Sequence, residues 1–287
     1  MKAIFKHELR LYFESMTAYV FGAFLLLFIG IGSMLYNLRS AVSNFEFVLS
    51  FAAIVFVVIV PVLTMRCLSE ERKQKTDQLL YSLPITTTQV VLGKYGAVLV
   101  VFLLPLCFIA LYPIMFAQFG DVYLPTAYGS LAAFFLLGAA LLAVGVFLSS
   151  LTDNQGLAAG LGIGVILLNY YCVSLSEYVS STAAGTAIAL VVLIAALGFL
   201  VKALTRSTPA GAGASLLLLA LLGLCYALDS TALEGLLPAI MKKISLFERF
   251  YTFVNGVFDL TNVVYFLSVT LFFLFLTVES LEKRRYN

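Results

Sequence analysis

The stretch RCLSEERKQKTDQLLYSLPITTTQVVLGKY, residues 66–95, interrupts a chain that is otherwise strongly apolar. Only 11% of the 287 residues are charged, yet seven of the twelve residues from Arg66 to Asp77 carry a charge. A charged side chain at the centre of a bilayer costs about 2.5–3.5 kcal/mol on insertion scales. We therefore expect this segment to lie outside the hydrocarbon, between two helices that cross a membrane.

The composition indicates an integral membrane protein. Hydrophobic residues make up 62% of the chain, against about 45–50% in a soluble domain. A net charge of +2 is too small to indicate a nucleic-acid partner. The four cysteines and the one histidine form no metal-ligand or disulfide pattern, so we expect no metal site.

Eight apolar runs come close to the roughly 20 residues that a helix needs to cross a bilayer. They are 17–36, 48–65, 95–117, 128–150, 157–175, 186–204, 212–228 and 262–280. The sixth and seventh are the least regular, because the stretch TRSTPAGAGAS separates them. The sequence thus predicts an all-α polytopic membrane protein with six to eight transmembrane helices, eight preferred, in a single domain over 1–287.

The distribution of basic residues predicts the orientation. If the N-terminus is cytoplasmic, 13 of the 17 Lys and Arg residues fall in the cytoplasmic segments, as the positive-inside rule requires. Those segments are 1–16, 66–94, 151–156, 202–211 and 281–287, so both termini are expected in the cytoplasm. Apolar residues at helical spacing predict that 1–16 is a surface helix, and the mixed segment 229–262 is expected to form short interfacial helices on the outer side.

The polar segment has the features of a helix that leaves the membrane, a break, and a helix that returns. Glu71 and Lys75 form a favourable i,i+4 pair, and three leucines precede Pro84, which ends a helix. Thr86 followed by Gln89 is a capping box, so a new helix is expected to begin there. The segment would thus project from the membrane with charged residues along its helix and leucines at its end. This pattern favours a protein-docking element over an ordinary loop.

Residues 61–98 resemble the intracellular loop of ABC-2 type transporter permeases. The shared pattern is a Pro-x-x-x-x-Arg end of the second span, an acidic-acidic-basic triplet, a Thr with downstream leucines, a Pro, and a Gly-Lys pair that opens the third span. The matching positions are Pro61, Arg66, Glu70, Glu71, Arg72, Thr76, Leu79, Leu80, Pro84, Gly93 and Lys94. Lys75 departs from the pattern, since Gly is expected before the Thr.

Residues 245–285 resemble the gliding-motility-type branch of the same family. They share its outer Phe-x-x-Phe-x-x-Gly-x-x-Asp segment, its last span and its basic tail. The matching positions are Phe247, Phe250, Phe253, Gly256, Asp259 and Tyr265. The resemblance implies an auxiliary membrane protein with a large outer domain, which the first five of these residues are expected to contact.

The resemblance implies the permease subunit of an ATP-binding cassette exporter in the cytoplasmic membrane of a prokaryote. Its loop from Arg66 to Lys94 would be a coupling helix docked on a separate ATPase, which binds ATP and Mg²⁺. A second permease copy or a homologous permease would complete a dimer. The chain itself is expected to have no catalytic residue and to bind no cofactor. LGKYG lacks the upstream Gly and the following hydroxyl of a P-loop.

Two alternative functions stay open. An ion-coupled secondary transporter would need an ionisable relay at mid-depth, and the cores of the predicted spans hold none. Asn169, Tyr170 and Tyr171 are the most polar patch within a span, either an inter-helix hydrogen bond, an interface anchor or a substrate contact. A membrane subunit that relays ATPase work to an outer partner without transport would have the same sequence features.

Three glycines share one face of the fifth predicted span. Gly156, Gly160 and Gly164 form two successive Gly-x-x-x-Gly steps, which let helices approach closely. Packing within the chain, a dimer seam and a sliding surface are the alternatives for this face.

Overall fold

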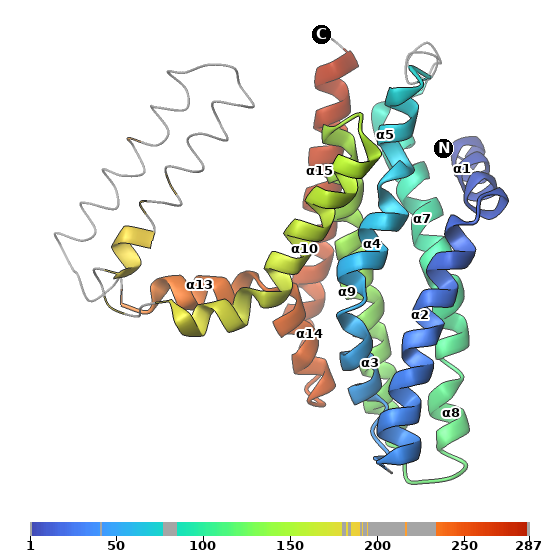
Figure 1. Cartoon of the computed structure of the whole chain (residues 1–287), viewed down its shortest axis with the longest axis vertical. Helices are drawn as coiled ribbons and strands as arrows, with labels where there is room; N and C mark the ends of the chain where they lie inside the picture. Colours follow the sequence, from blue (N-terminus) through green and yellow to red (C-terminus); the bar gives the residue numbers. More distant parts are fainter. Residues whose placement is uncertain are drawn as a thin grey trace. The chain divides into compact units, whose positions relative to one another are not determined.

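The computed structural model of the chain describes residues 2–40, 42–76, 85–179, 182, 185–189, 191, 194, 216 and 234–285 (Figure 1). Among these residues the regular structure is helical, with no strand. Contacts group the chain into two compact units, residues 1–170 with 249–287 and residues 171–248. The predicted all-α polytopic membrane fold is confirmed.

The first unit holds most of the described helices. They are α1 (Lys2–Glu14), α2 (Thr17–Ser33), the π-helix η1 (Met34–Arg39), α3 (Glu46–Ala53), α4 (Phe56–Thr64), α5 (Arg66–Lys73), α7 (Thr87–Ile109), α8 (Tyr112–Phe116), α9 (Leu124–Leu151) and α15 (Leu260–Arg285). α10 (Gln155–Tyr178) and α14 (Leu246–Val254) each run across the boundary between the units, and α13 (Leu236–Ile244) lies in the second unit. In the first unit α9 packs along α15 and also contacts α3, α4, α5 and α7.

Five described helices are long and apolar enough to cross a membrane. They are Thr17–Arg39, Thr87–Phe116, Leu124–Leu151, Gln155–Tyr178 and Leu260–Arg284. The predicted span 48–65 falls in a sixth candidate, in which Glu46–Ala53 and Phe56–Lys73 meet at an angle of 60°. The predicted spans 186–204 and 212–228 lie outside the described residues, apart from a few isolated positions.

Small and aromatic residues interlock at the centre of the first unit. A Cβ atom at Gly138 would overlap the ring of Phe102, and one at Gly145 would overlap the side chain of Thr64. Phe102 meets Phe56 with ring centroids 5.6 Å apart, and Phe56 meets Phe134 at 4.5 Å. These glycines let α9 approach α7 and α4 closely enough for the aromatic rings to fill the space between them.

Few atoms of the described residues approach the helix face that carries the three predicted glycines. A Cβ at Gly160 or Gly164 would meet no atom within 4 Å, and one at Gly156 would meet only Asn154 Oδ1, at 3.4 Å. The close approach in α10 occurs instead at Gly162, where a Cβ would lie 2.9 Å from Cβ of Pro61. The close contact of α10 thus uses a different face from that of Gly156, Gly160 and Gly164, and the packing role predicted for those three glycines stays a prediction.

We expect Gly162→Ala to lower the free energy of unfolding by about 1–3 kcal/mol, because the proline ring opposite is rigid and overpacking displaces backbone. Gly160→Ala on the same helix is the matched control and should be neutral or slightly stabilising. Unfolding of the detergent-solubilised protein, followed by circular dichroism, measures both. Equal stability of the two variants would mean that α10 does not approach α4 at Gly162.

Candidate functional site

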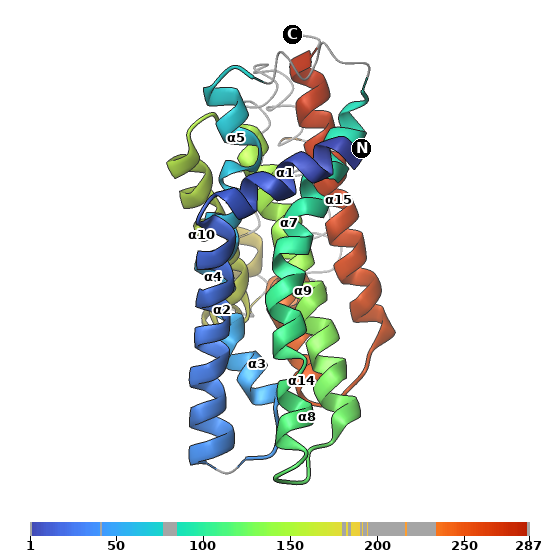
Figure 2. The same ribbon diagram turned by 90° about the vertical axis from the view of Figure 1, so that its right-hand side faces the viewer.

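The amphipathic helix α1 lies across one end of the helices of the first unit (Figure 2). It packs mainly on α7, where the ring of Phe5 lies within van der Waals reach of a Cβ placed at Gly96. Glu8 and Tyr12 are its two buried residues. Since Glu8 and Tyr12 are three and seven positions after Phe5, and Tyr12 is one turn from Glu8, a single stripe of α1 faces the protein.

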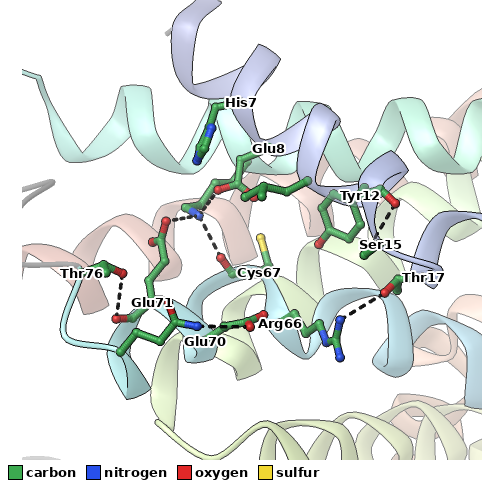
Figure 3. A pocket seen from close by; sticks show the side chains of 13 residues that line it. His7, Glu8, Tyr12, Ser15, Thr17, Arg66, Cys67, Glu70, Glu71 and Thr76 are labelled. Carbon is green, nitrogen blue, oxygen red and sulfur yellow. Dashed lines mark hydrogen bonds and ion pairs between the residues drawn. The ribbon is translucent and has the colours of Figure 1, made fainter.

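A buried ammonium group joins three helices at this end of the unit. Lys94 Nζ of α7 lies 2.5 Å from Glu8 Oε1 of α1, 2.8 Å from Glu71 Oε1 of α5 and 3.0 Å from the carbonyl oxygen of Cys67. The Lys94 side chain is 1% exposed, and those of Glu8 and Glu71 are 8% and 25% exposed. Figure 3 shows Glu8, Glu71 and Cys67 converging on one point. We call these four residues the Lys94 cluster.

The three ammonium protons of Lys94 match the three acceptors of this cluster. A buried charge is tolerated only when its partners replace the hydrogen bonds that water would make. Removing any one partner would leave an uncompensated charge or polar group beside an ammonium group that is itself almost fully buried. The Lys94 cluster therefore fixes the position of α1 and α5 relative to α7.

Tyr12 adds a second link between α1 and the membrane helices. Its hydroxyl donates to the carbonyl oxygen of Leu63 in α4, at 3.1 Å. Burial raises the pKa of Tyr12 well above its usual value, and the neighbouring Cys67 and Glu8 raise it further. The phenol therefore stays neutral and keeps donating throughout the physiological pH range.

Ser149 of α9 supports the start of α5, where the chain passes from α4 through Met65. Its hydroxyl donates to the carbonyl oxygen of Met65 at 3.1 Å and accepts from the backbone N–H groups of Leu68 and Ser69 at 3.1 and 3.2 Å. These are N–H groups of the first turn of α5, which has no side-chain cap of its own. A side chain distant in sequence thus takes the place of an N-cap.

A second ion cluster lies on the other side of α5. Arg72 NH1 lies 3.4 Å from Asp153 Oδ1 in the turn between α9 and α10, and Arg284 NH1 of α15 lies 3.5 Å from the same oxygen. Arg284 NH2 also donates to the carbonyl oxygen of Leu151 at 3.0 Å. We call Arg72, Asp153 and Arg284 the Arg72 cluster. Asp153 is 69% exposed, so this cluster is more open to solvent than the Lys94 cluster.

A cavity of about 550 Å³, lined by several charged and hydroxyl-bearing residues, lies between α1 and the α4–α5 segment (Figure 3). Its lining includes Arg66, Glu70, Glu71, Thr76 and Lys94, which are five of the positions predicted for ATPase docking. Arg66 is exposed and Glu70 is half-buried. The structure therefore brings these predicted residues together at one end of the first unit, although the role predicted for them stays a prediction.

The remaining predicted docking residues are placed differently. Arg72 is buried in the Arg72 cluster, and Gly93 is buried within α7. Leu79, Leu80 and Pro84 lie outside the described residues. The predicted start of the returning helix is confirmed, because Thr86 is the N-cap of α7 and its hydroxyl accepts from Gln89 N–H at 3.3 Å.

The backbone at Lys75 explains why the family pattern favours Gly at this position. α5 ends at Lys73, and Lys75 has φ of +57°, in the left-handed region that glycine adopts at helix C-termini. The chain bends there, and Thr76 turns its hydroxyl back to the carbonyl oxygen of Glu71 at 3.2 Å. The predicted Glu71–Lys75 helix pair is therefore wrong, since Lys75 lies beyond the helix and Glu71 pairs with Lys94.

Some of the residues predicted to contact an outer partner instead make contacts within the first unit. The ring of Phe250 lies 5.8 Å from that of Phe134, and the carbonyl oxygen of Phe253 accepts from Ser130 Oγ at 3.0 Å. Asp259 Oδ1 accepts from Thr261 N–H at 2.8 Å, at the start of α15. A partner would contact the exposed neighbours of these residues rather than the buried rings. In the second unit, Phe247 is 1% exposed.

Two further predicted positions are also described. Gly256 has φ of +80°, so it forms a turn that other residues adopt only with strain. Asn169 and Tyr170 are half-buried in α10, and Tyr171 is 45% exposed. A substrate contact at this patch stays a prediction. In the part of the chain that the structure describes, no three His, Cys, Asp or Glu side chains form a group that could hold a metal ion.

Glu8, Ser149 and Asp153 are site residues that were not predicted from the sequence. Glu8 had a detectable signal, because it lies between Phe5 and Tyr12 on the stripe of α1 that faces the protein. Ser149 and Asp153 had none, since their roles depend on α9 ending beside α5. Such a contact between residues some 80 positions apart follows from tertiary packing rather than local pattern.

Taken together, the fold and the site define a polytopic α-helical membrane protein in which a polar helix is fixed against the ends of the membrane helices. Residues 35–185 match the model of the ABC-2 family transporter proteins, more than half of the chain. The chain therefore belongs to this family, whose members are membrane permease subunits that work with an ABC ATPase. Comparisons with curated proteins and with solved structures gave no significant match.

We expect Lys94→Met to lower the free energy of unfolding by about 3–5 kcal/mol, because it leaves the buried Glu8 carboxylate without its cation. Lys6→Met, at an exposed position of α1, is the matched control and should change stability by less than about 0.5 kcal/mol. Denaturant titration in detergent measures both. If Lys94→Met were as stable as Lys6→Met, the Lys94 cluster would not hold the helices together.

Lys75→Gly should raise the free energy of unfolding by about 0.5–1 kcal/mol. The substitution removes the cost of a left-handed lysine, and the greater freedom of glycine in the unfolded chain offsets part of the gain. Lys73→Gly, in the last turn of α5, should instead be destabilising by about 1 kcal/mol. The same denaturant titration measures both, and a destabilising Lys75→Gly would contradict the left-handed conformation.

Proposed function

We propose that the chain is the permease subunit of an exporter and that its ATPase docks on α5 and the residues that follow it, on the cytoplasmic side. The observation that carries this proposal is the Lys94 cluster, which fixes a short polar helix to α1 and α7 through a buried ion network. A connecting loop needs no such attachment. A helix that receives force from a partner does, because a lever transmits motion only if it does not bend at its base.

The exposed surface of α5 and its C-terminal turn is suited to a protein partner. Lys73, Gln74, Lys75 and Thr76 are exposed, and Glu70 is half-buried at the edge of the cavity. Charges of both signs within one turn give a partner specific electrostatic contacts rather than a general attraction to anions. The orientation with α1 and α5 in the cytoplasm rests on the distribution of Lys and Arg residues.

A second permease chain and an outer auxiliary protein complete the proposed assembly. The glycine face of α10 supports the first, because a Cβ at Gly160 or Gly164 would meet no atom of the described residues within 4 Å. Exposed apolar side chains next to α14, Val257 and Phe258, support the second, since they are 56% and 68% exposed. The prokaryotic cytoplasmic membrane and the gliding-motility-type branch are parts of the proposal that rest on resemblance alone.

An ion-coupled transporter is the weaker alternative. The side chain of Glu46 is buried at the start of α3. Its Oε1 accepts from the hydroxyl of Thr126 at 2.5 Å. A carboxylate held by one hydroxyl does not form a chain of ionisable groups across the membrane, so it does not favour proton or ion relay.

The proposal is tested by ATPase stimulation in the co-purified complex. We expect Glu70→Lys, and separately Leu79→Asp, to reduce vanadate-sensitive ATPase activity about tenfold or more, while leaving membrane insertion and the unfolding midpoint unchanged. Glu70 accepts only a long 3.4 Å hydrogen bond from Gln74, so its reversal does not disturb the Lys94 cluster. Charge reversal of a docking contact typically costs several kcal/mol.

Asp121→Lys is the control, because Asp121 is an exposed carboxylate in the loop before α9, at the far end of the first unit from α1. It should leave ATPase activity unchanged. Full stimulation in both Glu70→Lys and Leu79→Asp would refute docking at this site. Purification of the chain with no ATPase would refute the larger proposal.

A further inference from the structure

A groove of about 790 Å³ lies at the end of the first unit opposite α1, where the last turns of α2 and the π-helix η1 face α7, α8 and the loop after α8 (Figure 1). This volume falls within the range of about 300–1,000 Å³ that small-molecule sites occupy. The walls are mostly apolar and include Leu26, Met34, Leu111, Met115 and Phe119. Both walls belong to helices that are long and apolar enough to cross a membrane, or to the loop that follows one.

Several side chains of the groove wall are apolar and exposed. The wall side chains Met34, Met115 and Phe119 are 63%, 57% and 88% exposed. Exposed apolar side chains on membrane-spanning helices face lipid chains rather than water. What enters the groove therefore comes from the membrane leaflet on that side.

Two residues that line the groove each have a buried polar atom without a hydrogen-bond partner in the part of the chain that the structure describes. Ser33 is 4% exposed, and its Oγ makes no hydrogen bond among the described residues. Asn37 donates through Nδ2 to the carbonyl oxygen of Val42 at 2.7 Å, but its buried Oδ1 accepts nothing in that same part of the chain. Both side chains line the groove. Buried polar atoms without a partner are rare and costly, and more so where a bilayer excludes water.

These two atoms define the chemistry that the groove accepts. An amide oxygen accepts hydrogen bonds and donates none, so Asn37 requires an N–H or O–H donor. Asn37 lies near the end of the span Thr17–Arg39, at the depth of lipid headgroups, and Ser33 lies one turn deeper. π-helical turns such as η1 occur frequently at functional sites.

We propose that this groove binds one phospholipid, whose headgroup amine or hydroxyl donates to Asn37 and whose acyl chain lies against the apolar walls. The lipid belongs to the leaflet opposite α1. Phospholipids with a donor in the headgroup fit, whereas phosphatidylcholine has none to offer Asn37. The proposal concerns a lipid site on this chain and does not depend on the transport function.

Two glycines of α2 give a matched pair of variants. Gly30 lines the groove, Gly22 does not, and a Cβ at either position would meet no atom within 4 Å. Gly30→Leu should fill the groove without disturbing the fold, while Gly22→Leu adds the same side chain elsewhere on the helix. Asn37→Leu removes the acceptor.

The experiment reconstitutes the full chain in nanodiscs that contain a trace of photoactivatable phosphatidylethanolamine or phosphatidylcholine, and maps the labelled peptides by mass spectrometry. We expect the ethanolamine probe to label the groove peptides about two- to tenfold more than the choline probe, the factor that one hydrogen bond supplies. Gly30→Leu should abolish this excess, Asn37→Leu should make the two probes equal, and Gly22→Leu should change nothing.

Equal labelling by the two probes in the unaltered chain would mean that only annular lipid contacts the groove, and would overturn the proposal. So would an ethanolamine excess that persists in Gly30→Leu. A thermal unfolding midpoint within the error of the unaltered chain is required of each variant, so that loss of labelling reports on the groove.

Discussion

The arrangement of the first unit depends on one buried cation. The Lys94 side chain is 1% exposed, and its ammonium group has a carboxylate acceptor from α1, a carboxylate acceptor from α5 and a backbone carbonyl acceptor, that of Cys67, also from α5. None of these elements has another ionic attachment to α7 in the part of the chain that the structure describes. The position of α1 across the bundle and the exit angle of α5 are therefore set together, because a buried charge tolerates no missing partner.

The sequence predicts the membrane helices well, because their signal is composition over about 20 residues. It also predicts the start of α7 from Thr86, since a capping residue has a local signature. This second prediction concerns the conformation of a few consecutive residues. Local chemistry is sufficient to specify such features.

Where the sequence failed, the competing contact was distant in the chain. Glu71 was expected to pair with Lys75 along the helix, but α5 ends at Lys73. Glu71 instead forms an ion pair with the buried Lys94 of α7. Gly162 packs on Pro61 although Gly156, Gly160 and Gly164 carry the recognisable pattern. A Gly-x-x-x-Gly pattern shows that a helix can be approached closely, while the rotation of that helix in the fold decides which glycine is used.

The Lys94 cluster and the Arg72 cluster both attach α5 to neighbouring helices, but they differ in the strength of their ion pairs. The Lys94 cluster is buried and each ammonium proton has an acceptor, so salt and solvent screen it little. The Arg72 cluster depends on Asp153, which is 69% exposed, and its two ion pairs are 3.4 and 3.5 Å long. Exposed pairs of this kind contribute about 0–1 kcal/mol. A force on α5 would therefore move α1 and α7 together with it. The ion pairs of the Arg72 cluster, which connect α5 to the α9–α10 turn and to the end of α15, would break first.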